Sequence, residues 1–285
     1  MRYKQLNNGI KMPMLGYGTL HIPLDMTEKC ILEALKAGYR LIDTASAYEN
    51  EAEIGKAIKK SNIPREELFI TTKVWVQDAG YENTMKAFKK SLKNLDLDYV
   101  DLYLIHHPYG DYYGSYRAME ELYKKGKVRA IGVCNFSQER FIDLYMNVQI
   151  KPMINQIEYH PFFIQEDTKS LLNQYHCELE AWAPLNDGQR DVFNHPVLQQ
   201  IAKKYGKSVA QVILCWHIQK GNIVIPKTIH KERMIENMNI WDFTLDESDI
   251  KEIEKLNLGY SEIIDYQYYF TAKILNKYKI HDEEE

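Results

Sequence analysis

Four side chains in the first half of the chain could together pass a proton to an oxygen atom. They are Asp43, Tyr48, Lys73 and His106. A free phenol has a pKa of about 10, so Tyr48 is a poor acid or base near neutral pH unless its anion is stabilised. A Lys73 ammonium within hydrogen-bond reach would favour that anion, and an Asp43 carboxylate would keep the ammonium charged. His106 could orient a carbonyl oxygen beside the phenol. The set predicts a site for protonating an oxygen.

Each of these side chains also has an ordinary structural explanation. Asp43 could cap the turn that follows it. Tyr48 is one of 21 tyrosines and could be a half-buried aromatic residue. Lys73 could point to solvent, and His106 could pack beside His107. For any one of them alone the structural explanation is the stronger one, but it weakens when all four follow neighbouring strands.

Apolar runs and amphipathic segments alternate along the chain, and this alternation must position the four side chains. A hairpin is expected first, because Asn7-Asn8-Gly9 between two short apolar segments suits a tight turn. Eight strand and helix units follow without a composition break, which favours one α/β domain over residues 1–285, a (β/α)8 TIM barrel with an N-terminal β-hairpin. We expect strands at 14–18, 39–43, 68–74, 99–105, 128–133, 152–157, 177–183 and 222–225. We expect helices at 26–37, 51–60, 81–95, 115–125, 137–146, 165–175, 195–205, 208–219 and 231–237.

The strands from the second onward each end near a polar or aromatic side chain. In chain order these are Asp43, Lys73, His106, Asn135, Gln156, Trp182 and Lys227. Active sites of such barrels form at the carboxyl ends of the strands, so these side chains should share one mouth. The tail, residues 262–285, is rich in tyrosine, and its acidic end is expected to be solvated.

Composition and charge disfavour several classes of function. The 285 residues are 45% hydrophobic, enough for a large core, and the net charge of −4 gives no basic field for nucleic acid or a membrane surface. No run approaches the ~18 apolar residues of a membrane span, and the opening segment lacks a secretory signal, so a cytoplasmic protein is expected. Four scattered cysteines without a Cys-x-x-Cys pair predict neither disulfides nor a metal site.

Six motifs resemble those of the aldo-keto reductase family, in the same order. They are 41–45 (Leu-Ile-Asp-Thr-Ala) with Tyr48, 72–75 (Thr-Lys-Val-Trp), 104–108 (Leu-Ile-His-His-Pro), 131–136 (Ile-Gly-Val-Cys-Asn-Phe), 155–158 (Asn-Gln-Ile-Glu) and 225–228 (Ile-Pro-Lys-Thr). The resemblance extends from 16–19 (Gly-Tyr-Gly-Thr) to about residue 256. It implies NADPH-dependent reduction of aldehydes or ketones, with a catalytic tetrad of Asp43, Tyr48, Lys73 and His106 and with Tyr48 as general acid.

The same resemblance implies where the nicotinamide end of the cofactor is held. The family uses a Ser-Asn pair and a Gln for the carboxamide, and Cys134, Asn135 and Gln156 stand there. Cys134 is a weaker hydrogen-bond partner than the family's serine. Trp182 replaces the tyrosine that stacks on the nicotinamide ring and offers a larger face, while Ala183 replaces a serine. Further implied cofactor contacts are Gly18, Thr19 and Leu185.

The resemblance places the adenosine phosphate near the last strand. Lys227, Thr228 and Arg233 match the family's phosphate-binding residues, and two cations beside a hydroxyl suit a 2′-phosphate better than a bare ribose. Glu236 and Asn237 match the family's adenine contacts. A solvated basic turn is the structural alternative. The chain has no Gly-x-Gly-x-x-Gly motif, so a Rossmann-type cofactor domain is not indicated.

The substrate pocket is implied to include the catalytic histidine and the residues near it. Its other expected members are Leu20, Trp75, His107 and Tyr109. Family members often have Trp where this chain has His107, which makes the wall more polar and is expected to titrate near neutral pH. The region 266–269 departs from the family's usual ending.

These observations predict a cytoplasmic, monomeric, NADPH-dependent reductase of small aldehydes, α-dicarbonyls or sugar-derived carbonyls. An alternative is an idle NADPH-binding protein with a sensing or structural role on the same fold, since folds host many functions. The complete tetrad argues against it. A barrel hydrolase would need two facing carboxylates at strand ends, and the sequence offers only Asp43 and Glu158.

Overall fold

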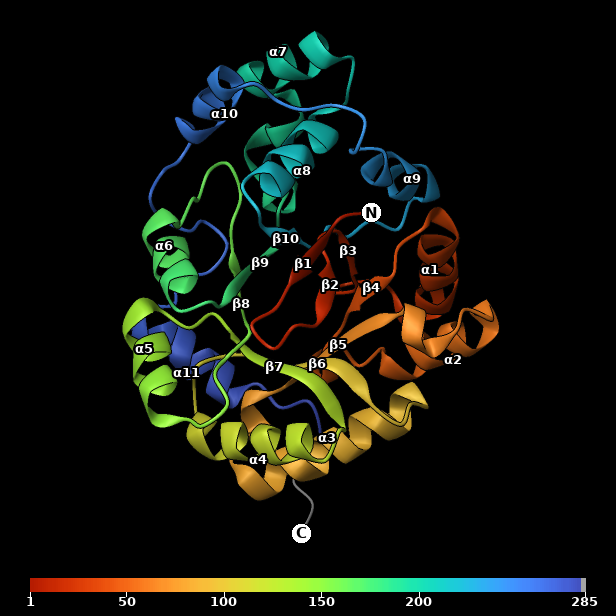
Figure 1. Cartoon of the computed structure of the whole chain (residues 1–285), viewed down its shortest axis with the longest axis vertical. Helices are drawn as coiled ribbons and strands as arrows, with labels where there is room; N and C mark the ends of the chain where they lie inside the picture. The colour runs from red at the N-terminus through yellow and green to blue at the C-terminus, as the bar shows by residue number, and fades with distance from the viewer. Residues whose placement is uncertain (283–285) are drawn as a thin grey trace.

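Eight parallel strands form the centre of the computed structural model, which describes residues 1–282 (Figure 1). They are β3 (Gly16–Gly18), β4 (Leu41–Asp43), β5 (Phe69–Val74), β6 (Val100–Ile105), β7 (Val128–Cys134), β8 (Ile154–Glu158), β9 (Glu178–Trp182) and β10 (Ile223–Val224). Each pairs with the next in the chain, and a parallel bridge between Leu15 and Val224 brings the first strand to the last. The predicted (β/α)8 barrel is confirmed.

A two-stranded antiparallel hairpin precedes the barrel and covers one end of it (Figure 1). Its strands are β1 (Tyr3–Gln5) and β2 (Lys11–Pro13), with Tyr3 opposite Pro13. Gly9 has a φ of 87°, which suits glycine, and its amide donates to the Leu6 carbonyl at 2.8 Å. Two residues of the hairpin, Leu6 and Met12, are buried. The expected N-terminal hairpin is confirmed.

Ten helices pack outside the strands. They are α1 (Leu24–Ala37), α2 (Glu51–Ser61), α3 (Tyr81–Leu95), α4 (Tyr112–Lys124), α5 (Gln138–Asn147), α6 (Glu166–Gln174), α7 (Pro196–Tyr205), α8 (Val209–Gln219), α9 (Lys231–Met238) and α10 (Glu247–Glu254). The helix α1 ends at Gly38, which adopts the left-handed conformation at φ 105°. The helix α8 begins with a reciprocal capping pair formed by Ser208 and Gln211. The nine predicted helices are present with end shifts of at most three residues, and α10 was not predicted.

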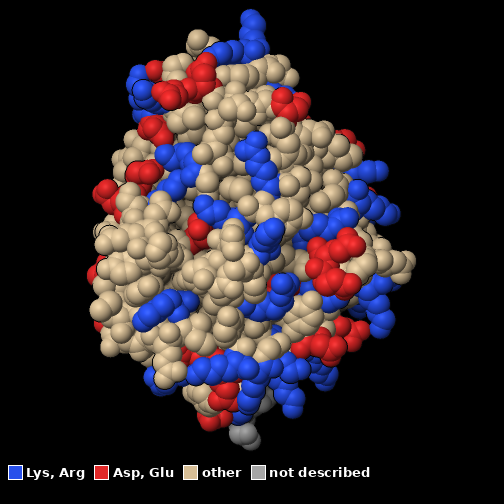
Figure 2. Space-filling model, in the orientation of Figure 1, with Lys and Arg blue, Asp and Glu red and all other residues tan. Residues whose placement is uncertain are grey.

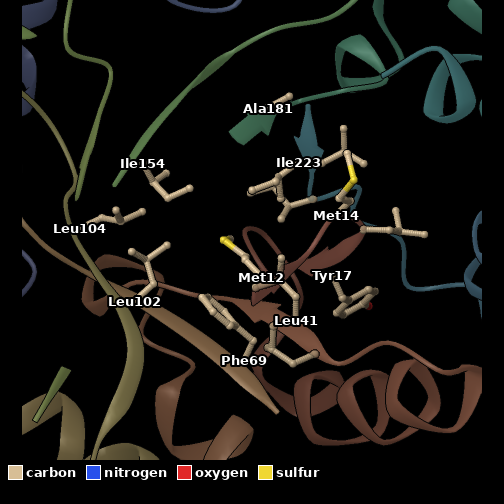
Figure 3. Close-up of a cluster of buried hydrophobic side chains, with 14 of the residues drawn as sticks. Met12, Met14, Tyr17, Leu41, Phe69, Leu102, Leu104, Ile154, Ala181 and Ile223 are labelled. Atoms are coloured by element: carbon tan, nitrogen blue, oxygen red, sulfur yellow. The ribbon is translucent and has the colours of Figure 1, made fainter. Parts of the chain in front are cut away.

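The interior of the barrel is filled by apolar side chains (Figure 3). Phe69, Leu102 and Ile154 come from three strands, and Met12 reaches them from the hairpin; all are buried. A filled interior is expected for eight strands, because the barrel is only wide enough for side chains. The packed core supports the strand ends, which carry the candidate site.

The tail contains a helix that was not predicted, α11 (Tyr269–Lys277), and none of its residues is buried. The segment that follows is fastened beside the short helix η3 (Val76–Asp78). The Trp75 indole donates to the Tyr278 carbonyl at 2.9 Å, and the Gln77 side-chain oxygen accepts from the Ile280 amide at 2.9 Å. The tail therefore returns to the loop after β5, close to Lys73.

The surface carries both signs of charge on the face seen in Figure 2, where acidic side chains lie among basic ones. Within residues 1–282 no helix is both long and apolar enough to cross a membrane. The same residues hold no group of three or more His, Cys, Asp or Glu that could bind a metal ion. All four cysteines are buried and unbridged.

Candidate active site

The predicted catalytic side chains meet at the carboxyl ends of three adjacent strands. Asp43 ends β4, Lys73 lies near the end of β5, and His106 follows β6. Tyr48 ends the short helix η1 (Ser46–Tyr48), which the loop after β4 forms. The Lys73 ammonium donates to Asp43 Oδ1 at 2.5 Å, to the Thr44 carbonyl at 2.9 Å and to the Tyr48 hydroxyl at 3.3 Å. The structure thus brings a carboxylate, an ammonium and a phenol into one contact chain.

The ammonium of Lys73 is fully buried and stays charged because of its partners. Burial alone lowers the pKa of Lys73, but the Asp43 carboxylate, by its charge and its hydrogen bond, raises it further than burial lowers it, so the pKa of Lys73 lies above the ordinary value. A buried ion pair of this kind holds its geometry because either charge alone would be costly to bury. Lys73 is therefore a fixed cation beside the phenol.

The phenol of Tyr48 keeps its proton in this environment. Burial raises its pKa, the Lys73 ammonium lowers it and the Asp43 carboxylate raises it, with a net rise to about 12. The expected lowering by Lys73 is thus present, but burial outweighs it. Tyr48 holds its proton at neutral pH and can release it only to an oxygen that becomes strongly basic.

Two stacked histidines form the wall beside the phenol. The rings of His106 and His107 lie 4.6 Å apart and nearly parallel, and the Tyr48 ring meets His106 edge-on at 5.5 Å. Burial lowers the pKa of both histidines, with the Lys73 ammonium adding to the effect, and the pKa of His107 falls to about 3. Both rings are neutral at physiological pH. The expectation that His107 titrates near neutral pH is wrong, because the side chain is buried close to a cation.

A buried glutamate beneath the four side chains was missed from the sequence. Glu180, in the middle of β9, is fully buried, and its Oε2 accepts from Gln156 Nε2 at 2.9 Å. The same Gln156 nitrogen donates to Asp43 Oδ2 at 2.8 Å. Burial raises the pKa of Glu180 to about 8, and the Asp43 carboxylate adds to the rise. A glutamate inside an otherwise buried parallel strand was the available signal.

The residues expected around the nicotinamide lie at the mouth beside the histidines. The Trp182 indole donates to Asn135 Oδ1 at 2.8 Å, and Asn135 Nδ2 donates to the His106 carbonyl at 3.1 Å. Asn135 has a φ of 61°, a conformation that Asn tolerates better than most residues. The Cys134 thiol reaches Gln156 Oε1 at 3.9 Å. The Asn135 backbone amide donates to the Gln156 carbonyl at 2.9 Å, which joins Cys134, Asn135, Gln156 and Trp182 into one network.

The loop after β10 presents two unpaired cations around a buried hydroxyl residue. Lys227 and Arg233 are exposed, and within residues 1–282 neither makes an ion pair. Thr228 between them is buried, and its carbonyl accepts the Tyr17 hydroxyl at 2.5 Å. In α9, Asn237 is buried and Glu236 accepts from Ser208. The two cations, Lys227 and Arg233, fit an anionic group.

The first barrel strand approaches this loop closely. A Cβ added at Gly18 would lie 2.7 Å from the Ile225 carbonyl oxygen, so only glycine fits there. Thr19 is buried and its hydroxyl donates to the Asp43 carbonyl at 2.9 Å. Ala183 follows Trp182 with a φ of 46°, and Leu185 is half-buried in the same loop. The remaining residues expected at the cofactor therefore flank the same strand ends.

The expected substrate wall gains one residue that sequence reasoning missed. The Tyr266 hydroxyl lies 3.0 Å from His107 Nδ1, and the Tyr109 hydroxyl reaches the Tyr266 carbonyl at 3.5 Å. Trp75 packs edge-on against His107 at 5.0 Å, whereas Leu20 is 44% exposed. No motif marked Tyr266, because it comes from the tail, where the sequence departs from the family.

Comparison with known proteins decides the family. A family model described as "Aldo/keto reductase family" matches residues 14–258. The chain belongs to the aldo/keto reductase family. The predicted family is confirmed, and with it the expected class of enzyme, an aldo-keto reductase.

Several members of the aldo/keto reductase family resemble this chain closely. A glyoxal reductase of Bacillus subtilis (strain 168) is 49% identical over 256 residues, which cover 89% of this chain and 92% of the relative. The crystal structure of an aldo-keto reductase from a Medee basin deep-sea metagenome library is 44% identical, with a TM-score of 0.89 and coverage of 92% of this chain and 100% of that one. An aldo-keto reductase of Bombyx mori in complex with NADP is 33% identical, with a TM-score of 0.88 and coverage of 93% and 95%.

Proposed function

We propose that this aldo/keto reductase uses NADPH to reduce small aldehydes, α-dicarbonyls or sugar-derived carbonyls to alcohols, with Tyr48 as the general acid. The observation that carries the proposal is the buried Lys73 ammonium, which contacts both Asp43 and Tyr48. Family membership supports it, as do a B. subtilis relative that is a glyoxal reductase and a B. mori relative solved with NADP. The glyoxal reductase relative supports a small carbonyl compound as the substrate.

The donors of the site fit a phosphorylated dinucleotide. Lys227 and Arg233 are unpaired within residues 1–282, so they are free to hold a 2′-phosphate beside Thr228. Asn135, Gln156 and Trp182 would hold the nicotinamide end. Contacts from Gly18, Thr19, Cys134, Ala183, Leu185, Glu236 and Asn237 would complete the cofactor site. When bound, NADPH supplies a hydride to the carbonyl carbon.

The four catalytic side chains then handle the oxygen of the carbonyl. A neutral His106 ring can donate one N–H to that oxygen and orient it beside the phenol. Tyr48 gives up its proton as negative charge develops on the oxygen, and Lys73 stabilises the phenolate that is left. Asp43 keeps Lys73 charged and in place. Leu20, His107 and Tyr109 would contact the rest of the substrate.

Replacing the phenol by a phenyl ring tests the proposal. In Tyr48→Phe the ring remains but the proton is absent, so we expect NADPH oxidation with methylglyoxal to fall about 10²- to 10⁴-fold. NADPH binding, measured by quenching of tryptophan fluorescence, should be retained. The matched control is Tyr81→Phe, because Tyr81 bonds to Glu121 away from the site. Full activity in Tyr48→Phe would overturn the mechanism, and binding without any turnover in the unaltered protein would favour an idle sensor.

We further propose that the chain acts as a single barrel domain, as a monomer and in the cytoplasm. Four buried, unbridged cysteines suit a reducing compartment. Light scattering of the purified protein tests the monomer, because a dimer would double the measured mass.

A further inference from the structure

Glu180 is a buried acidic residue inside the barrel, next to the polar groups of the candidate site. It is fully buried in the middle of β9, with Leu179 and Ala181 buried on either side of it in the strand. In the sheet register it lies opposite Gln156 on β8 and Ile223 on β10. A buried carboxyl group that has no role in the proposed chemistry needs a reason, because burying it without a charged partner is costly.

The amide of Gln156 connects this glutamate to the catalytic carboxylate. Gln156 Nε2 donates to Asp43 Oδ2 at 2.8 Å and to Glu180 Oε2 at 2.9 Å, which uses both of its N–H groups. Its oxygen accepts from the Cys134 thiol at 3.9 Å. The amide is therefore held from three sides, and Glu180 is one of the three.

The two carboxyl groups on this amide have different surroundings. Asp43 receives the Lys73 ammonium at 2.5 Å in addition to the amide. Glu180 receives the neutral amide alone among the described residues, and its Oε1 has no partner. The titratable groups that face Glu180 are Asp43 from β4 and Lys73 from β5, while the Cys134 thiol lies beyond Gln156 on β7. A lone pair left unpaired costs less on a neutral acid than on a carboxylate, so the contacts favour protonated Glu180.

We propose that Glu180 is a positioning residue which stays protonated at neutral pH, holds Gln156 against Asp43, and weakens the acid Tyr48 when it loses its proton. The proposal rests on the proposed function of Tyr48. Loss of the Glu180 proton to solvent adds a second negative charge next to Asp43. That negative charge offsets part of the stabilisation that the Lys73 ammonium gives to the Tyr48 phenolate. Tyr48 therefore gives up its proton less readily. Carbonyl reduction should then slow in mildly alkaline solution.

The first test detects the proton itself and needs no turnover. The carbonyl stretch of a protonated carboxyl is separate from that of a carboxylate in infrared difference spectra. We expect such a band at neutral pH that is absent in Glu180→Gln and that disappears from the unaltered protein as the pH passes through about 8. Glu51→Gln is the matched control, because Glu51 is also buried but bonds to Thr72 and Asn94. If the carbonyl-stretch band is the same in Glu180→Gln as in the unaltered protein, the proposal is wrong.

The second test measures the consequence for catalysis. Glutamine resembles the protonated acid in shape and can keep the hydrogen bond from Gln156. The Glu180→Gln variant should therefore still catalyse the reduction of methylglyoxal at neutral pH. The alkaline fall in kcat should move up by about one pH unit or more in this variant, and Glu51→Gln should leave it in place. An alkaline fall at the same pH in Glu180→Gln would refute the coupling to Tyr48. If the unaltered protein reduces no carbonyl, the proposed function fails, whereas the infrared test still decides the protonation of Glu180.

Discussion

At the scale of single residues, the surroundings of each side chain in the site determine whether it is charged or neutral. The Asp43 carboxylate accepts from the Lys73 ammonium at 2.5 Å, and Tyr48 keeps its proton because burial outweighs the effect of the same ammonium on its pKa. His106 and His107 stay neutral because burial and that ammonium both lower their pKa. Burial therefore keeps the phenol and both imidazoles in their neutral forms around one buried cation.

The phosphate assignment is a prediction about one cation. Arg233 is exposed on α9 and unpaired within residues 1–282, so its removal should cost little stability. Arg233→Ala should weaken NADPH binding about 10- to 100-fold, the worth of a charge-assisted hydrogen bond, and leave NADH binding nearly unchanged. Fluorescence titration with both cofactors measures this. Lys251→Ala on α10 is the matched surface control, and equal losses for NADPH and NADH would contradict the assignment.

Residue types were readable from the sequence, but their environments were not. Asp43, Lys73 and His106 could be placed at one mouth because each follows a strand and parallel strands end on one side. Glu180 was missed because its importance depends on the register that puts it opposite Gln156. The neutral state of His107 depends on the ring and cation packed around it, and no local pattern contains that information.

At the scale of elements, the tail is fastened by side chains rather than by a core. The helix α11 buries no residue, and the chain beyond it is held to η3 by Trp75, Gln77 and an ion pair between His281 and Asp78. The carbonyl of His281 also accepts from Gln77 Nε2 at 2.8 Å.

Gln77→Ala should release the tail. It removes two hydrogen bonds between the η3 loop and the chain after α11, each worth about 1 kcal/mol, so amide exchange in 269–282 should speed up roughly tenfold or more. The melting temperature should change little, because α11 contributes no buried residue to the core. Hydrogen–deuterium exchange read by mass spectrometry measures the effect. Gln149→Ala, at an exposed glutamine that bonds to Lys124, is the control, and unchanged exchange in 269–282 would show that Gln77 does not fasten the tail.

At the scale of the whole molecule, burial holds several titratable groups in their neutral forms. The pKa of His217 on α8 is lowered to about 3 by burial, with a backbone contact to Pro184 opposing the shift. His106 and His107 are lowered in the same direction. An unfolded chain would bind protons at these histidines near pH 6.5, whereas the folded chain does not. The folded state should therefore lose stability as the pH falls from about 6.5 toward 3.

His217 offers a measurable share of this acid sensitivity. At about pH 4.5 the His217 imidazole is protonated in the unfolded chain and neutral in the folded one. This residue alone should therefore lower the free energy of unfolding by about 2 to 3 kcal/mol relative to neutral pH. The glutamine in His217→Gln does not titrate. The variant should therefore show a difference in unfolding free energy between about pH 7 and pH 4.5 that is smaller by that amount, even if it is less stable than the unaltered protein at both pH values. Urea unfolding at the two pH values measures the difference, with the exposed His230→Gln as control. A pH dependence that is the same in His217→Gln and the unaltered protein would show that His217 is not held neutral in the fold.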